Sequence, residues 1–589
     1  MNSETRICQN CKHPFTIEPD DFAFYEKMKV PPPMFCPACR LQRRFAFANI
    51  TNLYKRKCDL CGKEVVSRYS VDKRYTVYCP HCWWSDKWDP MAYGRDYDFS
   101  RPFFEQFNEL WHEVPLLGLS IDLPTAIESP YVNDAGYLKQ CYLLFTANYS
   151  ERCFFGYMLT HDTDCANSSF INSCELGHDL FHCFKTYHAV HAYYTTQSSN
   201  MAFTWQCVNA QDCFMSANLH NKQYVIRNVA MTREAYQEEM KKYDLGSYRV
   251  YTDLKKEWAD YRLKFPVKTF WHEFSTDTSG LFVFQSKNCH KCFEVTGGEN
   301  CKYVVGAFTP TTKDCYDYAY WGDGAELLYE CMIVGEKTRR VFFGEESGLG
   351  LYDSQYVKLC TGGSNIFGSV SIKGKSFCIF NKQYSKEAYE ALVPKIIQHM
   401  SEMPYRDAKG RTYGYGEFFP IELSPFAYNE TLAMHPFPLA RTEAETEGYV
   451  WKDSEASPHV ITRNARDLPD HIRDTGDDIL RDVIGCARCG KGFRIIPQEL
   501  AFYRKMNVPL ARECPACRIE EKMREQPHPM KLWRRSCQCA GAHSQNSVYA
   551  NQSAHAHGAA RCVNEFETSY APDRPEIVYC EQCYQQEIL

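Results

Sequence analysis

Cysteine spacing is the feature that most restricts how this chain can fold. Two C-x-x-C pairs lie near the N-terminus, Cys8 with Cys11 and Cys36 with Cys39. Near the C-terminus the same arrangement recurs at an offset of 478 residues, and a gapless alignment of residues 8–40 with that later copy gives 17 identities in 33 positions. Self-similarity of this kind indicates an internal duplication of one module.

The spacing predicts a structural zinc site in each copy. A C-x-x-C turn places two thiolates on one side of a tetrahedral Zn²⁺ ion, and a second turn closes the site. Because four sulfurs leave no open coordination position, we expect a structural rather than a catalytic metal. Between the pairs, the sequence predicts a short helix over residues 20–28, which begins after Pro19 and ends before Val30-Pro31.

A second zinc ribbon is predicted after each first one. The C-terminal example is irregular, because Cys537-x-Cys539 and Cys580-x-x-Cys583 are separated by a long insert that also holds cysteine and histidine. Cys562 or a histidine could replace one of the four thiolates or build a further site, and His555 and His557 are the histidine candidates. About four zinc ions are therefore expected, with Cys8, Cys11, Cys36, Cys39, Cys58, Cys61, Cys79, Cys82, Cys486, Cys489, Cys514, Cys517, Cys537, Cys539, Cys580 and Cys583 as ligands.

The first and third modules resemble the probable zinc-ribbon domain family, which has C-x-x-C, a Phe-Tyr segment and then C-P-x-C-R. The matching residues are Phe24-Tyr25 and Cys36-Pro-Ala-Cys-Arg40 with their copies 478 positions later. The resemblance covers about 35 residues at each end of the chain. It implies zinc binding and no particular activity.

Composition limits the cellular setting. The chain has 589 residues, a net charge of -6 and 31 cysteines, without a readable signal peptide or a membrane-length apolar run. Many cysteines without a secretory signal favour a reduced, metal-binding protein over a disulfide scaffold. We therefore expect a cytoplasmic protein that does not enter membranes.

Basic linkers between paired ribbons suggest a second kind of partner. Residues 40–57 contain no acidic residue, and aromatic side chains are interleaved with the basic ones. Cations for phosphates and aromatics for base stacking are typical of nucleic-acid binding. The alternative is a solvated linker, or cations that face anionic Zn(Cys)₄ centres. The candidate nucleic-acid contacts are Arg40, Arg43, Arg44, Lys55, Arg56 and Lys57.

The middle of the chain predicts mainly β structure, with parallel β-solenoid blocks rich in cysteine and aromatic residues. Residues 129–221 have few charges, and their cysteines are separated by 12, 12, 9, 9, 24 and 6 positions, all multiples of three. Short alternating segments without hairpin signals favour a solenoid, with a coil of roughly 20 residues. Buried cysteines then act as small hydrophobes in a ladder. Redox or metal chemistry is the alternative for these thiols.

Two solenoid blocks are expected, each ended by a helix that covers the open end. Both contain Asn-Lys-Gln-Tyr, at residues 221–224 and 381–384, before a helix with Thr232 or Ser385 as N-cap. The whole layout resembles a group of bacterial proteins of unknown function with terminal zinc ribbons and a Cys-rich middle that ends in Phe-Asn-Lys-Gln-Tyr. The predicted domains are zinc ribbons at 1–48, 49–98, 483–526 and 527–589, a helical connector at 99–128, solenoid blocks at 129–231 and 271–384, a helical insert at 232–270, a capping helix at 385–402, and an irregular region with an acidic linker at 403–482.

No catalytic motif is recognisable, so the chain is not expected to be an enzyme. The favoured hypothesis is a zinc-binding scaffold or adaptor with a protein partner. The alternatives are a nucleic-acid-binding protein and a β-helix enzyme with acid–base chemistry. The enzyme hypothesis requires convergence of His161, Asp162, Asp164, His178, Asp179, His182, His188 and His191, whereas an ordinary polar outer face is the simpler explanation.

Overall fold

The computed structural model is mainly β and contains a parallel β-solenoid of about 19 turns, with cysteine clusters near both termini. None of the described helices is long and apolar enough to cross a membrane. The chain forms two compact units, of residues 1–119, 270–452 and 528–532, and of residues 120–269, 453–527 and 533–589. The structure describes residues 2–178, 187–193, 197–306, 311–319, 322–453 and 459–588.

The first solenoid segment has a coil of 12 residues, so the expected coil of roughly 20 residues is wrong. Tyr142 pairs with Phe154, and Ser199 pairs with Gln211, each in parallel register. The strands are β7 (Ala126–Ile127), β8 (Asn133–Lys139), β9 (Tyr142–Glu151), β10 (Phe154–Thr160), β11 (Ser169–Asn172), β12 (Glu175–His178), β13 (Tyr187–Tyr193), β14 (Ser199–Trp205), β15 (Gln211–Ala217) and β16 (Gln223–Ile226).

Each coil has four corners. From Asp134 to Leu176, every third residue adopts the left-handed backbone conformation, and the residue after such a corner points into the core. Twelve residues therefore make four sides of three residues each. This geometry explains why the cysteine gaps are multiples of three, because Cys141, Cys153 and Cys165 occupy equivalent inward positions on successive coils.

The second segment repeats this architecture with small irregularities. Paired residues on neighbouring coils are 12 positions apart in sequence for Lys287 with Glu299, and 14 positions apart for Gly298 with Thr312. Three 13-residue steps follow, from Lys313 to Glu326, from Glu326 to Arg339 and from Arg339 to Tyr352, before the spacing returns to 12 at Tyr352–Ser364. The strands are β19 (His272–Glu273), β20 (Thr276–Phe284), β21 (Lys287–Thr296), β22 (Gly298–Glu299), β23 (Thr312–Lys313), β24 (Val334–Gly335), β25 (Arg339–Glu345), β26 (Ser347–Gly348), β27 (Tyr352–Lys358), β28 (Ser364–Val370) and β29 (Ser376–Ile379).

An asparagine closes the last coil of each segment, but only in the second segment is it the asparagine of the Asn-Lys-Gln-Tyr motif. Asn381 accepts a hydrogen bond from the Val370 N–H (2.8 Å) and donates one to its carbonyl (2.9 Å). In the first segment Asn228, rather than Asn221, makes the same pair of bonds with Ala217, at 2.8 and 2.7 Å. The two motifs are therefore alike in sequence but differ in structural position.

Helices follow these closing turns as expected. After the short antiparallel strands β17 (Val229–Ala230) and β30 (Lys382–Gln383), the N-caps Thr232 and Ser385 start α5 (Arg233–Met240) and α7 (Lys386–Glu402). Tyr389 of α7 packs edge-on against Phe377 of the last coil. The insert also contains α6 (Tyr248–Tyr261), and the predicted connector contains α4 (Phe103–Glu113), whose Phe103 packs against Phe367 of β28.

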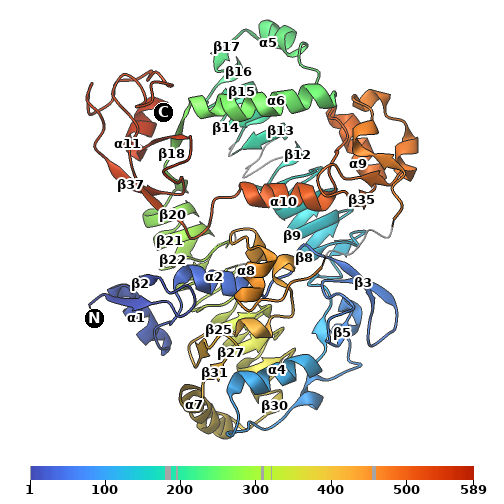
Figure 1. The fold of residues 1–589 in the computed structure, drawn as a ribbon, viewed down its shortest axis with the longest axis vertical. Helices are drawn as coiled ribbons and strands as arrows, with labels where there is room; N and C mark the ends of the chain where they lie inside the picture. Colours follow the sequence, from blue (N-terminus) through green and yellow to red (C-terminus); the bar gives the residue numbers. More distant parts are fainter. Residues whose placement is uncertain are drawn as a thin grey trace. The chain divides into compact units, whose positions relative to one another are not determined.

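The ribbons are paired with the solenoid segments in a crossed order. Ribbons 1 and 2 belong to the unit that contains the second segment, and ribbons 3 and 4 belong to the unit that contains the first. Figure 1 shows α10 beside the strands of the first segment, which it contacts at β10 and β11. The ribbon elements are β1 (Glu4–Ile7), β2 (Pro14–Ile17), α1 (Pro19–Met28), α2 (Pro37–Phe45), β3 (Tyr54–Lys57), β4 (Glu64–Ser67), α3 (Pro80–Trp83), β35 (Gly492–Phe493), α9 (Pro497–Met506), α10 (Pro515–Glu525), β36 (Trp533–Ser536), β37 (Glu565–Thr568), β38 (Ile577–Tyr579) and α11 (Glu581–Ile588).

Candidate metal centres

Four groups of four thiols each converge on one point. In the first ribbon, Cys8 and Cys11 lie at the turn between β1 and β2, and Cys36 and Cys39 lie at the start of α2. The predicted helix between the two pairs is present as α1. Within each group the ligand sulfurs all lie within 4.8 Å of one another, and the other three groups are Cys58, Cys61, Cys79 and Cys82; Cys486, Cys489, Cys514 and Cys517; and Cys537, Cys562, Cys580 and Cys583.

Sulfur–sulfur distances match a tetrahedral metal site. A Zn–S bond of about 2.3 Å gives a tetrahedron with an edge of about 3.8 Å. The Cys11–Cys36 distance is 3.8 Å and the Cys489–Cys514 distance is 3.7 Å. A disulfide would need about 2.05 Å, and every described cysteine is free. The thiols are therefore arranged as metal ligands.

Backbone N–H groups favour the thiolate form of the first cysteine in the second and third groups. The amide of Cys79 donates to the Cys58 sulfur at 3.2 Å, and the amide of Cys514 donates to the Cys486 sulfur at the same distance. Burial opposes ionisation of these two thiols, but amide donors outweigh it and lower the pKa of Cys58 and of Cys486 to about 7. A thiolate is the form that binds metal.

Three thiols in the solenoid core have the opposite character: their pKa values are raised. Burial raises the pKa of Cys141, of Cys207 and of Cys360 to about 12. Their S–H groups approach carbonyl oxygens, as in Cys141 with the carbonyl of Lys139 at 3.4 Å. These three cysteines are protonated core residues at neutral pH, which agrees with their predicted role as small hydrophobes.

The fourth group has a different ligand set from the simplest expected one. Cys562, from the long insert, joins Cys537, Cys580 and Cys583, and its sulfur lies 3.9 Å from that of Cys580. Cys539 belongs to a separate group with His555, His557 and the same Cys583. The sequence placed these residues among the candidates, but spacing alone could not decide which thiol completes which group.

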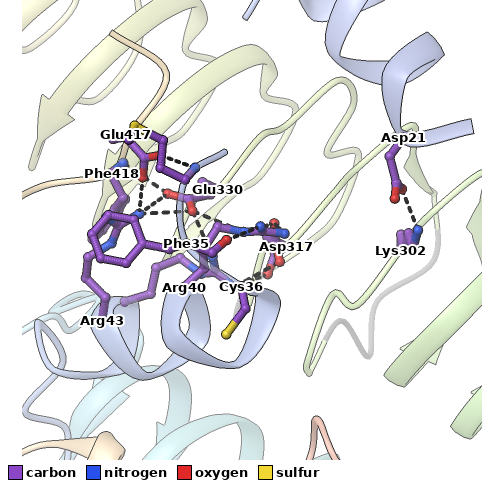
Figure 2. A network of polar contacts seen from close by, with 12 residues as sticks. Asp21, Phe35, Cys36, Arg40, Arg43, Lys302, Asp317, Glu330, Glu417 and Phe418 are labelled. Atoms are coloured by element: carbon purple, nitrogen blue, oxygen red, sulfur yellow. Dashed lines mark hydrogen bonds and ion pairs between the residues drawn. The ribbon is translucent and has the colours of Figure 1, made fainter. Parts of the chain in front are cut away.

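Three of the predicted nucleic-acid contacts are buried in ion pairs, as Figure 2 shows for Arg40 and Arg43. The side chains of Arg40, Arg43 and Arg44 are at most 2% exposed. Arg40 lies 2.6 Å from Asp317, and Arg43 lies 2.9 Å from Glu330 and 3.0 Å from Glu417. These guanidinium groups hold α2 on the second solenoid segment, so their assignment to nucleic acid is wrong.

The remaining basic candidates lie on strand β3. Lys55 and Lys57 are exposed, whereas Arg56 forms an ion pair of 2.9 Å with Asp59. No pattern in the sequence indicated the acidic partners of these arginines, because the partners lie about 280 to 370 residues away in sequence. A run of cations without local acids therefore looked solvent-facing when it was not.

The third ribbon docks on the first solenoid segment through a related arginine. Arg518, which occupies the position of Arg40 in the repeat, lies 3.1 Å from Glu499 and 2.9 Å from the hydroxyl of Tyr503. Its guanidinium lies over the ring of Phe155, 4.4 Å from the centroid. Beside it is a cavity of about 240 Å³, lined among others by Asn167 and His178.

The described members of the histidine–aspartate set have separate structural roles. His161 is exposed and stacks on Tyr149, while Asp162 is buried and accepts a hydrogen bond from the Cys174 N–H at 2.8 Å. Asp164 pairs with Arg152 at 2.6 Å. Among the set's described side chains, no common site forms. Asp179 and His182 lie outside the described residues, and so do the side chains of His188 and His191.

Comparison with known proteins adds no assignment to these centres. No protein-family model matches the chain, and a search of curated proteins finds no significant match.

Proposed function

We propose that the chain is a zinc-binding scaffold protein without a catalytic step, and that it binds a protein partner in a reducing, cytoplasmic setting. The observation that carries this proposal is the set of four all-thiolate groups with tetrahedral spacing. A metal with four thiolate ligands has no open position for substrate or water, which is typical of structural zinc. The resemblance of the terminal modules to zinc ribbons supports the same metal.

The helices that carry metal ligands, α2 and α10, also carry the arginines that contact the solenoid segments. In α2, Cys39 is a metal ligand, and the next residue, Arg40, makes the buried contact with Asp317. In α10, Cys517 is a metal ligand, and the next residue, Arg518, lies over the ring of Phe155 in the first segment. Zinc that fixes these helices would therefore also fix each ribbon on its solenoid segment. The proposed role of the metal is to hold a rigid binding surface together.

An exposed ladder of rings on the first segment is the candidate partner surface. Tyr137 stacks on Tyr149 at 4.5 Å between centroids, and Tyr149 stacks on His161 at 4.8 Å. The two tyrosines are 52% and 51% exposed. Tyrosine side chains are enriched where proteins bind one another. Nucleic-acid binding has less support, since three of its six candidate residues are buried.

Metal analysis tests the zinc part of the proposal. The purified chain should contain at least four zinc ions, and zinc removal with a chelator should expose α2 and α10 to proteolysis. Replacing Cys58 with Ser should lower the zinc content by one ion, whereas Cys360→Ser, in the solenoid core, should leave it unchanged. A chain that folds with fewer than four ions per molecule would contradict the proposal.

Cross-linking in the native cell tests whether the partner is a protein. A parallel sample is treated with nuclease. A protein partner should be lost in the double variant Tyr137→Ser, Tyr149→Ser and retained in Tyr352→Ser, which changes an exposed tyrosine of the other segment. Recovery of nucleic acid in place of protein would favour the alternative function.

A further inference from the structure

A second ligand group adjoins the fourth all-thiolate group. The sulfurs of Cys539 and Cys583 and one nitrogen each of His555 and His557 lie within 4.8 Å of one another. Cys583 also belongs to the group of Cys537, Cys562 and Cys580. We propose that the C-terminal ribbon holds two zinc ions, one bound by four thiolates and one by Cys539, His555, His557 and Cys583, with the Cys583 thiolate as a bridge.

The distances fit a tetrahedral site with mixed ligands. Zn–S bonds of about 2.3 Å and Zn–N bonds of about 2.0–2.1 Å give a sulfur–nitrogen edge of about 3.5 Å. The Cys539 sulfur lies 3.2 Å from Nδ1 of His555, and the Cys583 sulfur lies 3.4 Å from Nε2 of His557. Both edges are close to the expected length.

Each histidine is oriented by an acceptor on its other ring nitrogen. Nε2 of His555 lies 3.1 Å from the carboxylate of Glu587, and both side chains are fully buried. Nδ1 of His557 lies 2.8 Å from the carbonyl of Ala560. An N–H that donates to such an acceptor leaves the lone pair of the opposite nitrogen for a metal, as ligating histidines commonly show.

Glu587 is itself held in place. It accepts hydrogen bonds from the Tyr549 hydroxyl at 2.9 Å, the Gln552 N–H at 2.6 Å and the Ser553 N–H at 3.2 Å. These donors fix the carboxylate against His555. A carboxylate fixed in this way orients the His555 ring, so that Nδ1 faces the proposed metal.

The ligand count and the structure of the insert also favour a second ion. Cys539 accepts a hydrogen bond from the Asn551 side chain at 3.3 Å, which holds its sulfur in place. The five thiols and two imidazoles of the C-terminal ribbon are enough for two four-coordinate sites that share Cys583. Residues 540–564 contain no helix or strand, so a bound ion would supply the local core that this long insert lacks.

The second ribbon provides an internal comparison. It has the group of Cys58, Cys61, Cys79 and Cys82, and its described residues form no adjoining group. The inferred second ion is therefore specific to the C-terminal ribbon. This inference rests on the proposed zinc binding, but it adds a fifth ion and a bridging thiolate.

Zinc stoichiometry of the full-length protein tests the fifth ion. Wild type should bind five zinc ions, and the double variant His555→Ala, His557→Ala should bind four. His543→Ala is the matched control, because His543 lies in the same insert outside both groups, and it should retain five. Four ions in wild type and in the double variant would overturn this inference alone, whereas fewer than four in wild type would overturn the proposed function as well.

Replacing zinc with Co²⁺ tests whether the Cys583 thiolate bridges two ions. This test uses the wild-type chain, so its result does not depend on whether a variant folds. Two Co²⁺ ions that share a thiolate are magnetically coupled, so a chain with five Co²⁺ ions should show an electron paramagnetic resonance signal from about three. Glu587→Gln should weaken retention of the fifth ion by roughly 10- to 100-fold, since it replaces one of the two accepting oxygens with a donor and so disturbs the carboxylate that orients His555. Five uncoupled Co²⁺ signals would refute the bridge, and unchanged retention in Glu587→Gln would refute the positioning role of the carboxylate.

Discussion

Replacement of Arg43 with Met should detach the first ribbon from the second solenoid segment. Three guanidinium groups, of Arg40, Arg43 and Arg44, lie among the carboxylates of Asp317, Glu330 and Glu417, so the formal charges cancel. Removing one cation leaves a buried negative charge without compensation. Deletion of one partner from a buried ion pair typically costs about 3–5 kcal/mol.

Amide hydrogen exchange in α2 measures the free energy of local opening of this helix. It therefore does not require that a chain with several domains unfold as a single unit. An opening free energy lowered by about 3–5 kcal/mol should speed exchange by roughly 10²- to 10³-fold or more. The experiment belongs at pH 8, because burial raises the pKa of Glu417 to about 7 and the carboxyl must be ionised.

Two further variants separate charge from packing. The double variant Arg43→Met, Glu417→Gln restores the charge balance and keeps an oxygen that can accept the Met34 N–H, so it should exchange more slowly than Arg43→Met alone. Arg101→Met removes an exposed arginine that pairs with Glu105 and should leave exchange in α2 unchanged. Exchange in Arg43→Met within a factor of about 5 of wild type, a change of about 1 kcal/mol, would refute the reasoning.

Two other residues give separate predictions. Burial lowers the pKa of His528 from 6.5 to about 4, so acidification protonates this histidine in the unfolded chain before it does so in the folded one. Between pH 7 and pH 5, the free energy of unfolding of the wild type should therefore fall by about 1–2 kcal/mol. Parallel urea titrations of His528→Phe should not show this loss. Asn381→Ala should lower the thermal unfolding midpoint, because it leaves the N–H and carbonyl of Val370 unpaired, at about 1–3 kcal/mol for each group. Asn221→Ala, matched in sequence but exposed, should have little effect, and an equal shift in both variants would contradict the structural distinction.

The sequence was sufficient to predict the class of fold and the type of metal ligand. Cysteine pairs have a spacing that few chemistries other than zinc require, and the absence of hairpin signals indicated parallel coils. The coil length was misjudged because cysteine gaps in multiples of three are compatible with several coil sizes. The left-handed corner at every third residue, as at Tyr137 and Gln140, falls on ordinary residue types that do not mark turns.

Long-range partners could not be predicted. Nothing near Arg40 in sequence indicates that it pairs with Asp317, and a single chain without aligned relatives offers no signal for such a contact. The fourth metal group was ambiguous for a related reason. Cys539 and Cys562 are equally plausible ligands by spacing, and only the path of the insert between them assigns each to its group.

The crossed pairing of ribbons and solenoid segments affects how the protein is made. Ribbon 1 leaves the ribosome before the segment on which it docks, because its contacts at Asp317 and Glu330 are synthesised nearly 300 residues later. At about 5–20 residues per second, this delay is roughly 15–60 s. During that interval the docking face of α2 lacks the segment on which it packs, and early capture of the proposed zinc ion would keep the ribbon folded. Under the proposed function, the supply of zinc during translation, more than the stability of the finished protein, should therefore set the yield of correctly assembled chains.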